Sequence, residues 1–122
     1  MKLLIILFMF VSVRSYSQNA DAITGKWIKN NKEDLIIEVF EDNGAYYGKI
    51  DWSKDNTKPV GFLMLNKLIY NEEENRWEGG EIHDPNSGRT YDASITMQPN
   101  GTIEVTARKL FFKGKRIFRR VK

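Results

Sequence analysis

The sequence contains no cysteine and only one histidine. Without thiols the chain cannot form disulfides, cysteine-based zinc or iron–sulfur sites, or a thiolate nucleophile. A single histidine also excludes a histidine-rich metal site. We therefore expect neither a metal nor a cofactor, and a fold that is stabilised by burial and hydrogen bonding alone.

No apolar run in the chain reaches the length of about 20 residues that a membrane-spanning helix requires. The amino terminus has a shorter one, residues 3–13, between Lys2 and Arg14, and small residues follow it. This arrangement is typical of a secretory signal peptide. We expect a signal peptide at residues 1–17, cleaved after Ser17, and export to the periplasm or the extracellular space. A retained interfacial anchor is the alternative.

The mature chain, residues 18–122, has the length of one domain and can bury about two-thirds of its unfolded surface. Its charge is unevenly placed. Residues 108–122 hold eight basic residues and no acidic one, whereas residues 18–107 hold nine bases and all sixteen acids. The basic end therefore requires an explanation of its own.

Turn signals divide the mature chain into about eight short segments. Asn43-Gly44 is the strongest two-residue hairpin signal, because both positions of a type I′ turn need positive φ. Asp84 to Gly88 and Pro99-Asn100-Gly101 predict further hairpins, and Lys113-Gly114 is read as another turn. Residues 60–70 suit a helix as well as a strand, and we assign them to a strand.

Alternation of apolar and polar residues supports an all-β chain. Residues 91–97 and 103–107 alternate in this way, and Tyr46, Gly48, Ile50 and Trp52 fall on one face of a third strand. Short strands joined by tight turns predict a small antiparallel up-and-down barrel of about eight strands, because closure removes exposed edges. An open two-sheet sandwich is the alternative.

Several motifs in order along the mature chain resemble the bacterial secreted family DUF2147. They are Gly25-Lys26-Trp27, Tyr47-Gly48-Lys49-Ile50, the block from Trp77 to Pro85, Gly88-Arg89-Thr90-Tyr91 and Phe118-Arg119-Arg120-Val121. This family looks like a member of the lipocalin-like, or calycin, group of β-barrels. The resemblance implies a barrel for residues 18–122, in which an arginine of the last strand, Arg120, stacks on Trp27 of the first.

An eight-stranded barrel can be filled by its own side chains or can hold one small ligand. The resemblance favours a ligand, and inward-facing aromatic side chains would supply apolar surface with polar tips. A fully packed interior stays open as the alternative. The candidate ligand-binding residues are Trp27, Ile37, Tyr46, Ile50, Trp52, Tyr91, Ile95, Phe118 and Arg120.

No residue pattern commits the chain to a reaction. His83 and Asp84 are adjacent, so on a strand they point to opposite faces and cannot act as a base and its orienting partner. Asp84 is expected to bond the backbone of its own turn. The acidic run of residues 72–74 lacks the spacing of a calcium loop and is read as a solvated hairpin tip. An unrecognised hydrolase or isomerase remains a third hypothesis.

The expected function is an exported, monomeric, non-enzymatic barrel that binds a small, largely apolar molecule. The alternative is an interaction module of the cell envelope that uses the basic carboxyl-terminal hairpin. Clustered Lys and Arg favour anionic surfaces. Cross-strand charge pairing explains much of the cluster, so a solvated strand face is the leading interpretation of the basic end. If the cluster binds a partner, we expect an anionic envelope surface rather than nucleic acid.

Overall fold

The structure is a computed structural model that describes residues 19–121. The expected signal peptide, residues 1–17, and its cleavage site lie outside this range. No described helix is long and apolar enough to cross a membrane. The elements in chain order are η1 (Ala20–Ile23), β1 (Gly25–Lys29), β2 (Leu35–Asp42), β3 (Ala45–Ser53), η2 (Lys54–Asn56), β4 (Leu63–Asn71), β5 (Arg76–His83), β6 (Thr90–Met97), β7 (Ile103–Lys109) and β8 (Phe112–Arg120).

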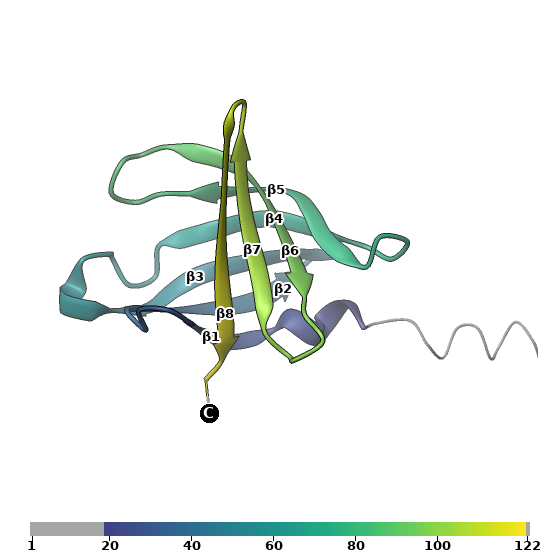
Figure 1. Cartoon of the computed structure of the whole chain (residues 1–122), viewed down its shortest axis with the longest axis horizontal. Helices are drawn as coiled ribbons and strands as arrows, with labels where there is room; N and C mark the ends of the chain where they lie inside the picture. Colours follow the sequence, from purple (N-terminus) through teal and green to yellow (C-terminus); the bar gives the residue numbers. More distant parts are fainter. Residues whose placement is uncertain (1–18, 122) are drawn as a thin grey trace, which may run out of the picture.

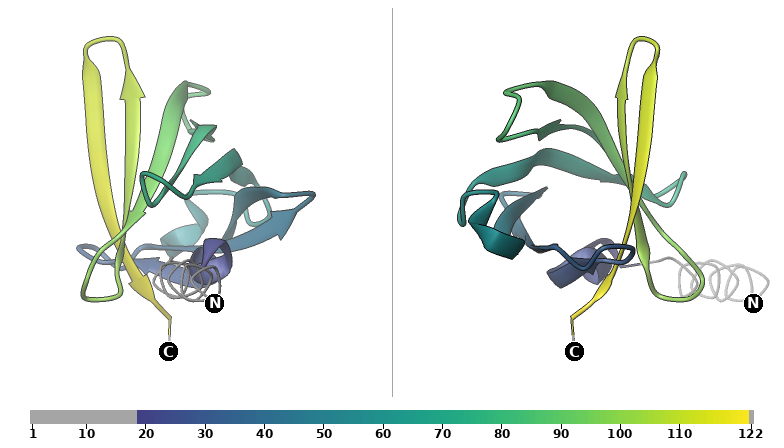
Figure 2. Two further views of the ribbon diagram at one scale, coloured as in Figure 1. Left: turned by 90° about the vertical axis from the view of Figure 1, so that its right-hand side faces the viewer. Right: turned by 60° about the vertical axis from the view of Figure 1, so that its left-hand side comes forward.

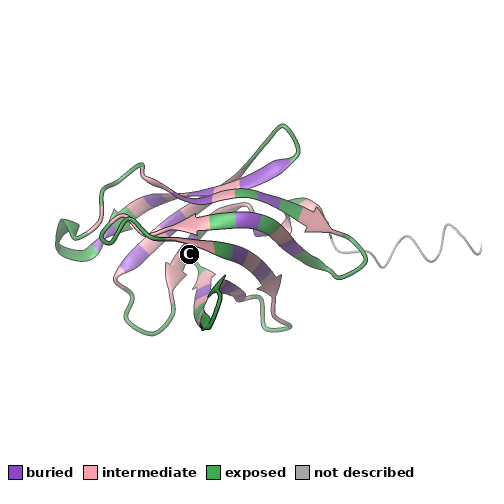
Figure 3. Ribbon diagram, turned by 90° about the horizontal axis from the view of Figure 1, so that it is seen from above, coloured by how far each residue is buried: buried purple, intermediate pink, exposed green. Residues whose placement is uncertain are grey.

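Each strand pairs antiparallel with the next one, and β8 returns to β1, so the sheet closes into an eight-stranded barrel (Figure 1). The prediction of an all-β up-and-down barrel is confirmed, and the open sandwich is excluded. Buried and exposed residues alternate along the strands (Figure 3), as expected where one face of a sheet is packed and the other is solvated. Residues 60–70 contribute to β4, as the strand assignment predicted.

Turn chemistry accounts for some of the hairpins and not for others. Asn43 and Gly44 have φ values of 53° and 83°, which confirms the predicted β2–β3 hairpin. The expected turn at Lys113-Gly114 is wrong, because Gly114 lies inside β8 opposite Ala107. The chain reverses three residues earlier, at Leu110 and Phe111, and Leu110 adopts a φ of 44° although bulky residues rarely do so.

A bulge in β3 reverses the orientation of its last residues. Ile36 pairs with Trp52 and Ile37 pairs with Ile50, so one extra residue, Asp51, is inserted in β3. An inserted residue exchanges the two faces of the strand beyond it. Trp52 is consequently 42% exposed, and Ser53 takes the buried position. The prediction that Trp52 faces the interior is therefore wrong.

The 3₁₀-helix η1 closes one end of the barrel. Its Ile23 is fully buried in the core, and three side chains from the strands bond to the helix. The indole nitrogens of Trp27 and Trp77 donate to the carbonyls of Ile23 and Ala20, both at 2.9 Å. The Tyr46 hydroxyl donates to the carboxylate of Asp21. Buried polar tips thus find partners, as buried Trp and Tyr require.

The seam between β1 and β8 is short and consists of three residue pairs, of which Trp27 and Arg120 form one. The Arg120 guanidinium lies 4.3 Å from the centre of the Trp27 ring, so the stacking implied by the family resemblance is confirmed. Arg120 also donates to the carbonyls of Thr24 and Ala22. The part of β8 that precedes Phe118 does not pair with β1, and there the β7–β8 hairpin projects from the barrel (Figure 2).

Candidate functional site

A hollow of about 300 Å³ lies at the barrel end opposite η1, and we call it the mouth cavity. It is formed where β2, β4, β6 and β8 begin and where β1, β5 and β7 end. Its apolar lining combines aliphatic and aromatic side chains from six strands, namely Leu35, Met64, Ile82, Tyr91, Val105, Ala107, Phe112 and Phe118.

The hollow exists because two facing positions on β7 and β8 carry almost no side chain. Ala107 pairs with Gly114, and both line the cavity. The ring of Phe112 lies over the gap, since a Cβ on Gly114 would come within 2.9 Å of its Cζ. Phe112 also packs on Tyr91, with 5.4 Å between the ring centres. Two aromatic rings therefore border the entrance.

Charged groups surround this apolar interior. Lys29 forms an ion pair with Asp34 at 3.1 Å, and Lys58 donates to the side chain of Asn86 at 2.7 Å. Partial burial would raise the pKa of Asp34, but the Lys29 ammonium holds it below its ordinary value. Arg116 lies two residues after Gly114 and therefore on the same, inner face of β8. Its guanidinium has no carboxylate partner among residues 19–121.

The polar residues next to the cavity do not form a nucleophile and base pair. His83 contacts Thr90 through Nδ1 at 3.1 Å and Glu81 through Nε2 at 3.6 Å. Ser87 donates instead to Asp84. The backbone N–H of Asn86 is the main cause that lowers the pKa of Asp84, so this carboxylate bonds its own turn, as predicted. No group of potential metal ligands occurs among the described residues.

The predicted ligand-binding residues separate into four groups. Those at positions 27, 37, 50 and 95 are fully buried in the core, and Tyr46 is 4% exposed beside η1. Only Tyr91 and Phe118 line the mouth cavity. Arg120 lies at the closed end, and Trp52 lies outside. Sequence reasoning identified the inward face of β7 but missed the contributions of Leu35, Met64 and Ile82, which lie near strand ends.

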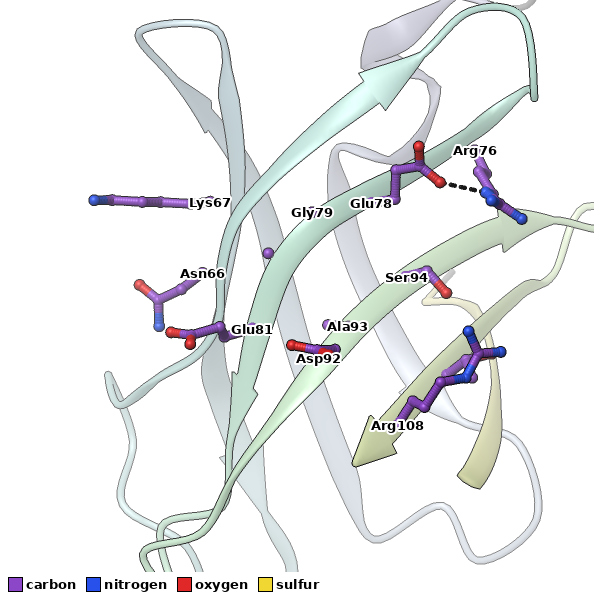
Figure 4. Close-up of a pocket in the computed structure, with 12 residues that line it drawn as sticks. Asn66, Lys67, Arg76, Glu78, Gly79, Glu81, Asp92, Ala93, Ser94 and Arg108 are labelled. Atoms are coloured by element: carbon purple, nitrogen blue, oxygen red, sulfur yellow. Dashed lines mark hydrogen bonds and ion pairs between the residues drawn. The ribbon is translucent and has the colours of Figure 1, made fainter. Parts of the chain in front are cut away.

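A second hollow of about 640 Å³ lies on the outer wall, over β4 to β7 (Figure 4). Charged side chains surround it, including the ion pair between Arg76 and Glu78. Gly79 has no side chain to fill the floor of this hollow. It lies at a bulge in β5, where the backbone φ of 78° favours glycine. Although larger, this groove is lined mainly by polar and charged side chains, so it offers less apolar burial than the mouth cavity. The mouth cavity is the better candidate for a small-molecule site.

The closed antiparallel up-and-down barrel defines the fold class of the protein, a small lipocalin-like β-barrel. A search of solved structures finds the protein HP1028 from Helicobacter pylori, which is described as belonging to the lipocalin family. The two folds superpose with a TM-score of 0.68, over 82% of this chain and 83% of that chain, at 20% sequence identity.

Within this class, the sequence model of one bacterial family matches residues 25–120. Its description is "Uncharacterized protein conserved in bacteria (DUF2147)", and the chain belongs to this family. The match spans all eight strands, from the first residue of β1 to the last residue of β8. A search of the curated proteins finds no match.

Proposed function

We propose that the protein binds one small, largely apolar molecule in the mouth cavity. The observation that carries this proposal is the pairing of Ala107 with Gly114, which leaves an apolar hollow beside a core of buried hydrophobic side chains. Ligand sites are mostly apolar clefts of roughly 300–1,000 Å³ with a few polar groups. At about 300 Å³ the cavity suits a small ligand.

Apolar burial would supply the affinity, at roughly 25 cal/mol for each Å² removed from water. The rings of Tyr91 and Phe112 would cover the ligand at the entrance. The charged side chains around the rim would orient its polar part. We further propose that the protein acts outside the cytoplasm, which the leader-like residues 1–17 support, and that it acts as a monomer.

Binding can be tested with N-phenyl-1-naphthylamine, a neutral probe that fluoresces in apolar sites. The wild-type protein should enhance its emission. Ala107→Trp would place an indole inside the cavity and should abolish the enhancement. Thr96→Trp is the matched control, since Thr96 lies on the outer face of the neighbouring strand β6, and it should leave the enhancement unchanged.

Circular dichroism of both variants should show that the barrel is retained. Equal enhancement by wild type and Ala107→Trp would mean that the probe binds elsewhere, and the proposal would fail. Native mass spectrometry of protein purified from its own host offers an independent test. A co-purifying small molecule that Ala107→Trp excludes would identify the natural ligand.

A further inference from the structure

The tip of the β7–β8 hairpin exposes more apolar surface than any other described part of the chain. Leu110 is 90% exposed and Phe111 is 103% exposed, and the ring of Phe112 beside them is 51% exposed. They are consecutive, and the hairpin carries them away from the barrel wall (Figure 2). Scattered apolar residues on a surface are ordinary, but a contiguous exposed group marks an interaction site.

Folding does not account for these residues. The turn needs a left-handed backbone at Leu110, whose φ is 44°, a conformation that glycine or asparagine adopts more readily. The side chains at the tip also gain no burial in the folded chain. A position that is unfavourable both for the backbone and for the side chain is expected at a functional site.

The charged residues of the hairpin on both sides of the tip, residues 108–109 and 113–120, are all basic. Lys115 pairs with Glu104 at 3.6 Å, Arg119 pairs with Glu33, and Arg108 faces Asp92 across the sheet. In contrast, Lys109 and Lys113 have no carboxylate within ion-pair distance among residues 19–121. The same holds for Arg116, farther down β8. The apolar tip is therefore adjoined by cationic side chains that have no ion-pair partner among the described residues.

We propose that this hairpin docks the protein on an anionic lipid bilayer. Leu110 and Phe111 would enter the boundary between headgroups and acyl chains, which interfacial segments reach at a depth of about 5–10 Å. Lys109, Lys113 and Arg116 would contact the phosphate headgroups. A soluble polyanion could satisfy the cations, but it would not bury the two exposed apolar side chains, whereas an anionic bilayer does both.

Docking would also place the mouth cavity next to the membrane. Phe112, Gly114 and Arg116 line the cavity and belong to the same hairpin. An apolar ligand could then pass between the acyl chains and the barrel without crossing bulk water. This inference extends the proposed function, but it does not depend on it, because bilayer binding is measured without any ligand.

The test is co-sedimentation of the mature protein with vesicles of phosphatidylglycerol and phosphatidylcholine in equal amounts, and with vesicles of phosphatidylcholine alone. The protein should bind the anionic vesicles and show little binding to the neutral ones. Leu110→Ser combined with Phe111→Ser should lower the partition coefficient at least about tenfold. Ile69→Ser, which removes an exposed apolar side chain from the outer wall of β4, should leave it unchanged.

Charge reversal separates the electrostatic contribution to vesicle binding from the apolar contribution of the tip. Lys113→Glu should lower anionic vesicle binding by more than about fivefold, as expected from roughly 1 kcal/mol per basic residue near a charged membrane. Lys67→Glu makes the same change in net charge at an exposed position of β4 and should have a much smaller effect. Binding that is equally sensitive to both variants would reflect net charge alone and would overturn the proposal.

Insertion can be observed directly because the chain has no native cysteine. Leu110→Cys labelled with nitrobenzoxadiazole should brighten and shift to the blue when anionic vesicles are added. The same label on Glu73→Cys, at the β4–β5 turn, should not respond. A label at position 110 that stays in water, or a lipid-free dimer in sedimentation velocity that Leu110→Ser with Phe111→Ser dissociates, would overturn bilayer docking. Neither result would affect probe binding in the mouth cavity.

Discussion

Removal of the Arg120 side chain should destabilise the barrel by about 2–3 kcal/mol. The guanidinium stacks on Trp27 at the exposed end of the seam, where a cation–π contact contributes roughly 0.5–1 kcal/mol. It also donates to the carbonyls of Thr24 and Ala22, and each such hydrogen bond contributes about 1 kcal/mol net. These interactions hold the segment after η1 against β8.

The assay is urea unfolding of Arg120→Ala, followed by circular dichroism. For a domain of this length the expected loss corresponds to a fall in Tm of about 10–20 °C. Arg120→Lys keeps the charge but loses the planar stacking and the forked donor geometry. Its stability should therefore lie between those of the wild type and Arg120→Ala. Arg119→Ala is the matched control: its ion pair with Glu33 is largely solvent-exposed, so less than about 1 kcal/mol should be lost. Equal losses for Arg119→Ala and Arg120→Ala would refute the reasoning.

Three further predictions concern the sheet, the closed end and the mouth. Gly80→Ala should cost about 3 kcal/mol or prevent folding, because its Cβ would lie 2.2 Å from the backbone oxygen of Asn66. Gly114→Ala should cost less than about 1 kcal/mol, since it meets only the movable ring of Phe112; thermal melts compare the two, and equal losses would contradict this. Tyr46→Phe removes the hydroxyl that bonds Asp21 and should cost about 1 kcal/mol in urea unfolding, with no loss contradicting a role for that bond. Because the pKa of Asp84 is lowered in the folded state, its carboxylate stabilises the protein above an ordinary Asp pKa of about 3.9, and this contribution is lost as the pH falls through the lowered pKa. Asp84→Asn should therefore be less stable than wild type in urea titrations at neutral pH and nearly equal to it in strong acid, and a constant difference would contradict the assignment.

Local sequence signals predict those features of the fold that depend on short-range chemistry. The alternation along β6 and β7 gave the correct inward face, and Asn43-Gly44 gave the correct turn, because period and positive φ are properties of a few consecutive residues. The bulge at Asp51 has no such signal. It depends on how β2 and β3 pair, so the orientation of Trp52 could not be read from alternation.

The position of the hollow could not be predicted for a similar reason. It requires that Ala107 and Gly114 be cross-strand partners, and the interpretation of Gly114 as a turn residue removed it from the strand. The plug formed by η1 was also missed, because a helix of four residues has no periodicity to detect. Both features arise from contacts between segments that are distant in sequence.

The three-pair seam between β1 and β8 has a consequence for the order in which the chain is made. Its partners, Phe118 to Arg120, lie in β8, which follows the other seven strands in the sequence. A nascent chain therefore has no means of completing the ring until β8 itself has been translated. A chain that stops before Phe118 would leave both edges of the sheet open to pairing with other chains.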